Sequence, residues 1–211
     1  MKWELGIAFA VLSVLAAHAQ NSAPQTSPQF SAILRAQQHR DAVLGAAKQS
    51  TSWIRLNCQK MSFIPLPLMR IWKPLEFDSN GAPTAGVWGE TLEASGCGTT
   101  KKLNVVTIVR GPRQLVTGVL APGDTSADPV LQKDAWRYVY AAAKVKVTAP
   151  GCQQAFVDNT QAVRKEEPTD AQLTGPILVE NWTVVACGQT VVVEVKFLPT
   201  ANGTTIGAHA L

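Results

Sequence analysis

The chain has 211 residues, of which 46% are hydrophobic and 16% are charged, and its formal net charge is +4. This length can build one or two domains with cores of their own, and so mild a positive charge argues against nucleic acid as the partner. The basic pairs Lys101-Lys102 and Arg164-Lys165 are short and scattered, so we expect solvated edges rather than a track for phosphates.

The N-terminal segment has the pattern of a cleaved signal peptide. An apolar run over residues 5–17 follows Lys2, and Ala17-His18-Ala19 supplies small residues at the cleavage positions. A membrane anchor is the weaker alternative, because ~20 apolar residues are needed to cross the hydrocarbon core. We predict a signal peptide over 1–19, a flexible leader over 20–29, and a periplasmic or secreted mature protein with no transmembrane anchor.

The first helix is predicted over residues 30–50, with a possible extension to Leu56. Its apolar residues fall mostly at helical spacing: Phe30, Ile33, Leu34, Val43, Leu44, Ala46 and Ala47. His39 falls on the polar side of this pattern, beside Arg40 and Asp41. We therefore expect a surface histidine.

Residues 61–77 are apolar and contain three prolines, which keep the chain extended and disfavour a regular inner strand. Such a segment either fills a core or offers a docking surface, and the scarcity of bare apolar surface on soluble proteins favours the core. Its counterpart in the second half, residues 158–174, is polar and reads as a solvated loop. This difference leads to a docking hypothesis, in which the partner-binding residues are Phe63, Leu66, Leu68, Ile71 and Trp72.

Alternating apolar residues predict strands on both sides of two Cys-Gly turns. The inward residues after the turns are Leu103, Val105, Thr107 and Val109 in the first half, and Val191, Val193, Val195 and Phe197 in the second. Gly98 and Gly188 are expected at hairpin tips, where positive φ is needed. A third strand is expected over residues 114–120 and 204–210.

The second helix is predicted to begin at Asp128 and Pro129, a capping residue followed by a first-turn proline. Apolar residues then recur at steps of four and three. The predicted buried stripe is Leu131, Ala135, Tyr138, Ala142 and Val145.

The two halves of the chain share an ungapped pattern. Residues 90–100 and 180–190 both begin with Glu and carry Cys-Gly at the same offset, and an Asp-Ala followed by a Cys-Gln recurs upstream. We predict an α+β fold of two pseudo-repeats, over 30–125 and 126–211, each with one helix packed on an antiparallel β-meander.

Four cysteines in an exported chain predict disulfides. Three pairings are possible, and the repeated pattern favours Cys58 with Cys97 and Cys152 with Cys187. A metal site is the weaker alternative, because no Cys-x-x-Cys is present and only His39 and His209 remain after cleavage. No cofactor is expected.

The sequence contains no Gly-x-Ser-x-Gly, phosphate-loop or His-Glu-x-x-His motif, so no catalytic residue is predicted. The favoured reading is a non-enzymatic binding or assembly module of the bacterial envelope, whose partner is a protein or a polymer. The alternative is a small envelope hydrolase that uses Glu90, Glu180 and also His39 as acid/base groups. For the two glutamates, we favour outward positions paired with cross-strand lysines.

The chain also resembles a loose group of exported bacterial proteins of unassigned function. The resemblance rests on the Cys-Gly hairpin after an aromatic strand and on the stretch Asp-Pro-x-Leu-Gln-x-Asp-Ala at residues 128–135. It covers about half of the chain. It implies an envelope location and no particular chemistry.

Overall fold

The computed structural model describes residues 27–149, 151–168 and 170–211, so the predicted signal peptide and residues 20–26 of the leader lie outside the described residues. The elements are α1 (Pro28–Arg35), α2 (Gln37–Lys48), α3 (Thr51–Ile54), β1 (Ser62–Phe77), β2 (Pro83–Gly96), β3 (Thr99–Gly111), β4 (Gln114–Val119), β5 (Gly123–Asp124), α4 (Pro129–Lys146), β6 (Ala155–Glu166), β7 (Ile177–Ala186), β8 (Gln189–Thr200) and β9 (Gly203–Ala210). The fold is α+β, as predicted.

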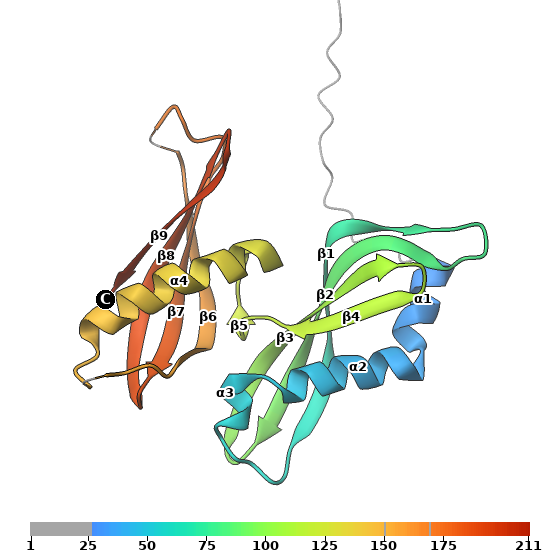
Figure 1. Ribbon diagram of the computed structural model, residues 1–211, viewed down its shortest axis with the longest axis horizontal. Helices are drawn as coiled ribbons and strands as arrows, with labels where there is room; N and C mark the ends of the chain where they lie inside the picture. Colours follow the sequence, from blue (N-terminus) through green and yellow to red (C-terminus); the bar gives the residue numbers. More distant parts are fainter. Residues whose placement is uncertain (1–26, 150, 169) are drawn as a thin grey trace, which may run out of the picture.

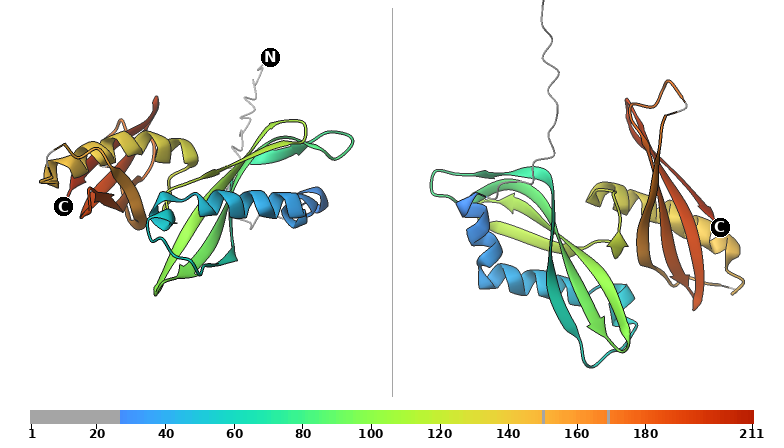
Figure 2. Two further views of the ribbon diagram at one scale, coloured as in Figure 1. Left: turned by 60° about the horizontal axis from the view of Figure 1, so that its bottom comes forward. Right: turned by 180° about the vertical axis from the view of Figure 1, so that it is seen from behind.

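The strands form two sheets, one in each half of the chain (Figure 1). The first has the order β1-β2-β3-β4, and the second has the order β5-β6-β7-β8-β9. All neighbouring strands are antiparallel except β5 and β6. Helix α2 lies across the first sheet and α4 across the second (Figure 2), so each half has its own helix-on-sheet core.

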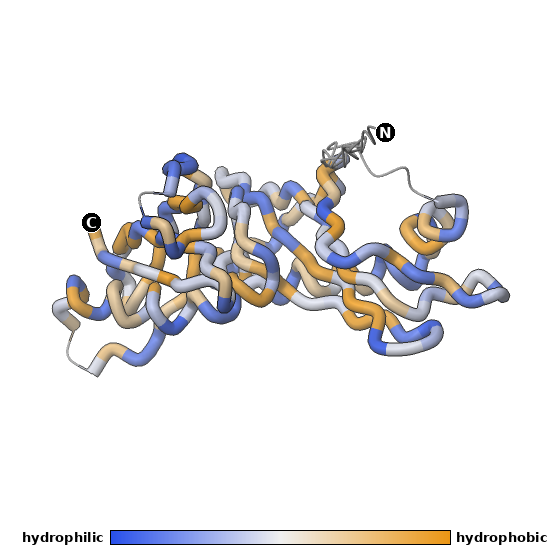
Figure 3. The backbone as a smooth tube through the Cα atoms, turned by 90° about the horizontal axis from the view of Figure 1, so that it is seen from above, coloured by the Kyte–Doolittle hydropathy of each residue, from blue (hydrophilic) through white to orange (hydrophobic). Residues whose placement is uncertain are grey.

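The first core lies between α2, α3 and the inner face of β2 and β3. Its buried apolar residues are Val43, Ala46, Ala47 and Trp53 from the helices, and Leu92, Ala94, Leu103 and Val105 from the strands. Hydrophobic and hydrophilic residues are interspersed along the backbone (Figure 3), and in β2 the buried Leu92 and Ala94 alternate with the less buried Glu93 and Ser95, as expected for a sheet with one packed face.

The single helix predicted from residue 30 is wrong in its extent. The chain instead forms three helical segments, with Ala36 in an extended conformation (ψ 132°) between α1 and α2. The last leader residues are also helical, because Pro28 and Gln29 begin α1 and the Ser27 side chain accepts a hydrogen bond from Phe30 N. The bend allows the Phe30 ring to pack edge-on against Trp88, at 5.2 Å between centroids.

The second core lies between α4 and strands β7, β8 and β9. The alternation predicted for β8 is confirmed, because Val191, Val193, Val195 and Phe197 are all buried. The buried stripe of α4 is displaced from the predicted one and consists of Gln132, Ala135, Val139 and Ala143. Tyr138 and Val145 are exposed, because the helix turns a neighbouring face toward the sheet.

The polar segment 158–174 is not the loop that we predicted. Its first half belongs to β6, which pairs with β7 from Ala155 to Glu166. The exposed residues of this strand are polar or charged, as in a loop. Its backbone nevertheless forms an antiparallel ladder with β7.

Both Cys-Gly dipeptides occupy the tips of two-residue hairpins. The φ angles are 50° and 74° at Cys97 and Gly98, and 48° and 81° at Cys187 and Gly188. Positive φ at both central residues defines a type I′ turn, which matches the twist of paired strands. The predicted hairpins are therefore confirmed.

The predicted disulfides are also confirmed. Cys58 is bonded to Cys97 and Cys152 to Cys187, and no described cysteine is free. Each bond joins a hairpin tip to the segment that follows a helix: α3 in the first half, and α4 in the second. Each disulfide therefore fixes the end of the helical layer to the end of its sheet.

The linker between the halves, residues 120–128, is hydrogen-bonded to a strand of each sheet. The Asn104 side-chain amide of β3 donates to the carbonyls of Ala121 (2.8 Å) and Gly123 (2.9 Å). On the other side, the Pro122 carbonyl accepts hydrogen bonds from the backbone N (2.7 Å) and the hydroxyl (2.8 Å) of Thr160 in β6. A Cβ at Gly123, where φ is 97°, would lie 2.3 Å from the Thr160 carbonyl, so this contact requires glycine.

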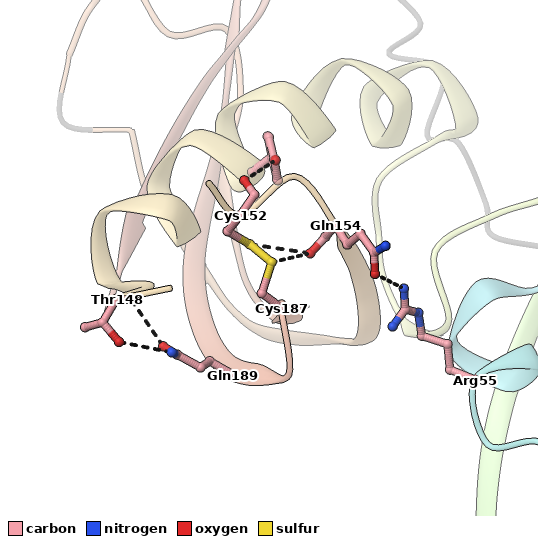
Figure 4. The surroundings of a disulfide bond; sticks show 7 residues. Arg55, Thr148, Cys152, Gln154, Cys187 and Gln189 are labelled. Carbon is pink, nitrogen blue, oxygen red and sulfur yellow. Dashed lines mark hydrogen bonds between the residues drawn. A yellow bond between two sulfur atoms is a disulfide. The ribbon is translucent and has the colours of Figure 1, made fainter. Parts of the chain in front are cut away.

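Side chains add further contacts between the halves. Figure 4 shows the Gln154 side chain, next to the second disulfide, accepting a hydrogen bond from Arg55 at 3.0 Å. Arg55 also lies over the Phe156 ring, 4.9 Å from its centroid. Two ion pairs complete the junction, Lys101 with Asp158 (2.6 Å) and Lys102 with Asp124 (2.8 Å).

Candidate functional site

The inner face of β2 carries a polar cluster at the edge of the first core. Glu90 shares this face with Trp88 and Leu92, which are both buried. Its Oε1 accepts a hydrogen bond from the Trp88 indole N–H at 3.1 Å and contacts His39 Nε2 at 2.7 Å. Glu90 therefore faces α2, and the predicted outward position with a cross-strand lysine is wrong.

His39 is buried, so the surface position predicted from its polar neighbours in the sequence is wrong. Its side chain is only 3% exposed, and its ring centroid lies 5.8 Å from that of Trp88. Because Nε2 contacts a carboxylate oxygen, the neutral imidazole carries its proton there and leaves a lone pair on Nδ1.

The other ring nitrogen of His39, Nδ1, has no hydrogen-bond partner. Among the described residues, His39 Nδ1 and Thr107 Oγ1 are the buried side-chain polar atoms that make no hydrogen bond. Thr107 is the cross-strand partner of Trp88, so both atoms belong to residues that neighbour the same indole. Unpaired buried polar atoms are uncommon in native proteins and mark this corner of the core as unusual.

Glu180 occupies the corresponding position in β7 but has a different environment. It is completely buried and lies on the α4 side of the second sheet, so its predicted outward position is wrong too. Its carboxylate accepts hydrogen bonds from Thr125 Oγ1 (2.8 Å), Ser126 N (2.5 Å) and Trp182 Nε1 (2.9 Å). These contacts anchor the end of the linker just before α4.

The structure thus brings together two of the three proposed acid/base residues. His39 and Glu90 are in contact in the first half, whereas Glu180 is engaged by other groups in the second sheet. The Trp88 and Trp182 indoles are missed by the sequence prediction, although each lies two residues from its glutamate, the spacing of side chains on one strand face. No group of three or more His, Cys, Asp or Glu that could hold a metal ion is found among the described residues.

The segment with the predicted partner-binding residues forms β1, an edge strand with a three-residue bulge. Pro65 pairs with Leu92 and Met69 with Glu90, so residues 66–68 lie opposite Thr91 alone. Leu68 is 53% exposed in this bulge, and Ile64 is 53% exposed nearby. The bulge therefore presents apolar side chains outside the sheet.

The five predicted partner-binding residues differ in their packing. Phe63 lies against Trp53, at 5.9 Å between centroids, and packs on the first core. Leu66, Ile71 and Trp72 are half-buried. Trp72 lies directly on the backbone of Gly89, where a Cβ would be 2.4 Å from its ring. Leu68 is the most exposed and, with Trp72 and Arg70, lines a hollow of about 200 Å³ beside the linker.

A second hollow, of about 580 Å³, lies between the halves. Residues of α3, β4, α4 and β6 line it, and its aromatic walls are Trp136 and Phe156. The linker and the contacts between the halves hold both walls of this hollow in place, so the fold itself determines its shape.

The outer face of the second sheet carries exposed ion pairs rather than an unpaired basic patch. Arg164 Nη2 lies 2.7 Å from Glu166 and 3.4 Å from Glu194, and Lys196 lies 3.2 Å from Glu166. The hydrogen bond from Arg164 holds the pKa of Glu166 below its ordinary value. A lowered pKa stabilises the fold at neutral pH and loses that effect as the pH falls through it, but exposed pairs of this kind contribute little.

Comparison with protein-family models, with curated proteins and with solved structures finds no match to this chain. No described helix meets the length and hydropathy needed to cross a bilayer.

Proposed function

We propose that this protein is an exported binding or assembly module of the bacterial envelope, which binds a protein or polymer partner through the bulged edge strand β1. The observation that carries the proposal is the exposure of Leu68 and Ile64 on a strand whose outer edge no other described strand covers. Edge strands and exposed apolar bulges are the usual means of recognising an extended partner. The two disulfides support an oxidising compartment.

We also infer that the two halves descend from one duplicated unit. Support comes from the shared order of helix, cysteine, two strands, Cys-Gly turn and two strands, and from the buried glutamate that each half pairs with an indole. On this view β1 and β6 are counterparts, and only β1 has acquired an apolar bulge.

A small envelope hydrolase is the second candidate, and the contact between His39 and Glu90 favours it. A carboxylate that orients an imidazole is a common arrangement for a general base. If this function is correct, the purified protein hydrolyses an envelope polymer such as peptidoglycan, and both Glu90→Gln and His39→Gln abolish that activity while Glu180 plays no part in the chemistry.

Export predicts a defined mature N-terminus. Intact mass measurement of the protein isolated from its native host should give a chain that begins at Gln20 and weighs four hydrogen atoms less than its reduced form, as two disulfides require. The protein should be recovered in the periplasmic or extracellular fraction. An unprocessed chain in the cytoplasm would contradict the proposed location.

Binding through β1 predicts that Leu68→Ala weakens partner binding without loss of stability. A central apolar anchor typically contributes ~2 kcal/mol or more to binding, about thirty-fold in affinity. Leu68 is half exposed, so its truncation should leave the melting temperature almost unchanged. Capture from the envelope fraction, followed by measurement of affinity for the isolated partner, tests both expectations.

Three matched variants sharpen this test. Val145→Ala truncates an 83% exposed residue of α4 and should change nothing. Trp72→Ala uncovers the sheet at Gly89, so it should lower the melting temperature as well as the affinity. Trp136→Ala removes a wall of the hollow between the halves. Lost capture in Trp136→Ala, with normal capture in Leu68→Ala, would move the binding site from β1 to that hollow.

A further inference from the structure

The neighbourhood of His39 offers a hydrogen-bond acceptor that the described fold does not use. Glu90 Oε1 receives the Trp88 indole N–H and lies 2.7 Å from His39 Nε2, so the carboxylate fixes both the orientation and the tautomer of the imidazole. The lone pair of Nδ1 is then directed away from Glu90. No described group donates to it.

The imidazole forms part of the wall of a cavity of about 380 Å³. This cavity lies between the helices α1 and α2 and the β3–β4 hairpin, outside both hollows described above. Its lining includes Ile33, Ala36, His39, Arg113, Leu115 and Thr117. A volume of this size suits a small organic molecule, and the lining combines apolar side chains with a few polar groups, as small-molecule sites do.

Arg113 supplies a positive charge at this cavity. It lies at the tip of the β3–β4 hairpin with φ 61°, and its guanidinium makes no ion pair or hydrogen bond with any described residue. Free guanidinium groups bind carboxylates with two parallel hydrogen bonds. The amide side chains of Gln38 and Gln114 on the same lining can add donors to an anion.

We propose that this cavity binds a small organic acid that carries a hydroxyl group. Arg113 pairs with the carboxylate of the ligand, its hydroxyl donates to His39 Nδ1, and its carbon skeleton packs against Ile33 and Leu115. Nδ1 is shielded from bulk water, so the hydroxyl of the ligand reaches it only when the groups that cover it move aside. The same shielding removes competition from water and favours a ligand with a donor over one without.

Matched pairs of acids test each part of this site. Lactate, 3-hydroxybutyrate and mandelate are titrated into the mature protein, each beside the acid that lacks the hydroxyl: propionate, butyrate and phenylacetate. The readout is the ¹⁵N chemical shift of His39 Nδ1, measured by NMR on the folded wild-type chain. We expect saturable shifts with at least one hydroxy acid, and about ten-fold weaker binding of its partner, the usual effect of one hydrogen bond.

The charge is tested with the methyl ester of the best hydroxy acid and with Arg113→Gln, which should each weaken binding about ten-fold or more. Arg110→Gln is the control, because Arg110 is an exposed arginine near the same hairpin but outside the cavity lining. Arg113 is exposed, so its replacement should leave the chain folded. This result would not depend on whether β1 binds a partner.

Two outcomes would overturn the proposal. One is that none of the three hydroxy acids shifts His39 Nδ1 at concentrations up to ~10 mM, well above the Kd of a site whose groups are arranged for the ligand. The other is that the shift is the same for hydroxy acids and their partners and persists in Arg113→Gln, which would mean a general effect of added acid.

Discussion

Replacement of Glu180 by leucine is expected to lower the free energy of unfolding by roughly 2–6 kcal/mol, because two buried donors lose their acceptor at a cost of ~1–3 kcal/mol each. Glu180 is wholly buried and accepts hydrogen bonds from Thr125, Ser126 and Trp182. Leucine would leave the buried Thr125 and Trp182 donors unpaired, whereas Ser126 is exposed and its N–H can bond to water. Urea unfolding of the protein with its disulfides intact provides the measurement.

Two other glutamates serve as comparisons for this variant. Glu90→Leu should also be destabilising, by roughly 2–6 kcal/mol, because it leaves the buried Trp88 indole and the buried His39 imidazole without their acceptor at ~1–3 kcal/mol each. Glu76→Gln alters an exposed residue of β1 and should change stability by less than ~0.5 kcal/mol. If Glu180→Leu were as stable as Glu76→Gln, the network that joins the linker to the second sheet would not exist in solution.

Removal of either disulfide is expected to lower the free energy of unfolding by about 2–5 kcal/mol. The two bonds close similar loops, with sequence separations of 39 and 35, so the chain-entropy contributions should be nearly equal. Cys58 is buried whereas its counterpart Cys152 is only half-buried, and the hairpin-tip residues Cys97 and Cys187 are both exposed. The double replacement Cys58→Ser and Cys97→Ser should therefore cost more than Cys152→Ser and Cys187→Ser, because it also places a hydroxyl in a packed position.

The pairing itself is checked by peptide mapping under non-reducing conditions. Peptides that join Cys58 to Cys97 and Cys152 to Cys187 are expected. A peptide that joins Cys97 to Cys187 would contradict the fold, because these residues lie at the tips of hairpins in different sheets. Thermal unfolding of each double variant with and without a reductant then measures how much the remaining bond contributes.

Periodic signals along the chain predicted the parts of the fold that depend on local pattern. Strict alternation identified β8, and Cys-Gly flanked by strands identified both hairpin tips, although the sequence predicts positive φ only at the glycines and the structure has it at Cys97 and Cys187 too. The disulfide pairing followed from the repeated spacing of the cysteines. These features depend on neighbours a few residues apart, or on a repeat visible in the sequence itself.

The parts that the sequence did not predict depend on packing between distant elements. His39 follows Gln38 and precedes Arg40, so its neighbours in sequence indicate a surface, whereas its burial depends on Glu90, which is 51 residues away. The charged residues of β6 concealed a strand because they stay largely exposed, and the segment is recognised as a strand only by its backbone pairing with β7. The buried stripe of α4 differs from the predicted one because Gln132 is buried, with hydrogen bonds to the backbone of Ala121 and Ala127. The spacing of apolar residues along a helix does not predict such contacts.

The linker has a consequence for how the chain unfolds. Pro122 and Gly123 are hydrogen-bonded to Thr160 in one sheet and Asn104 in the other, so neither half can open at this point without breaking bonds in its neighbour. Two cores joined in this way should melt in one cooperative transition rather than in two. A molecule bound to either half would then protect both halves from proteolysis, because both share the same open state.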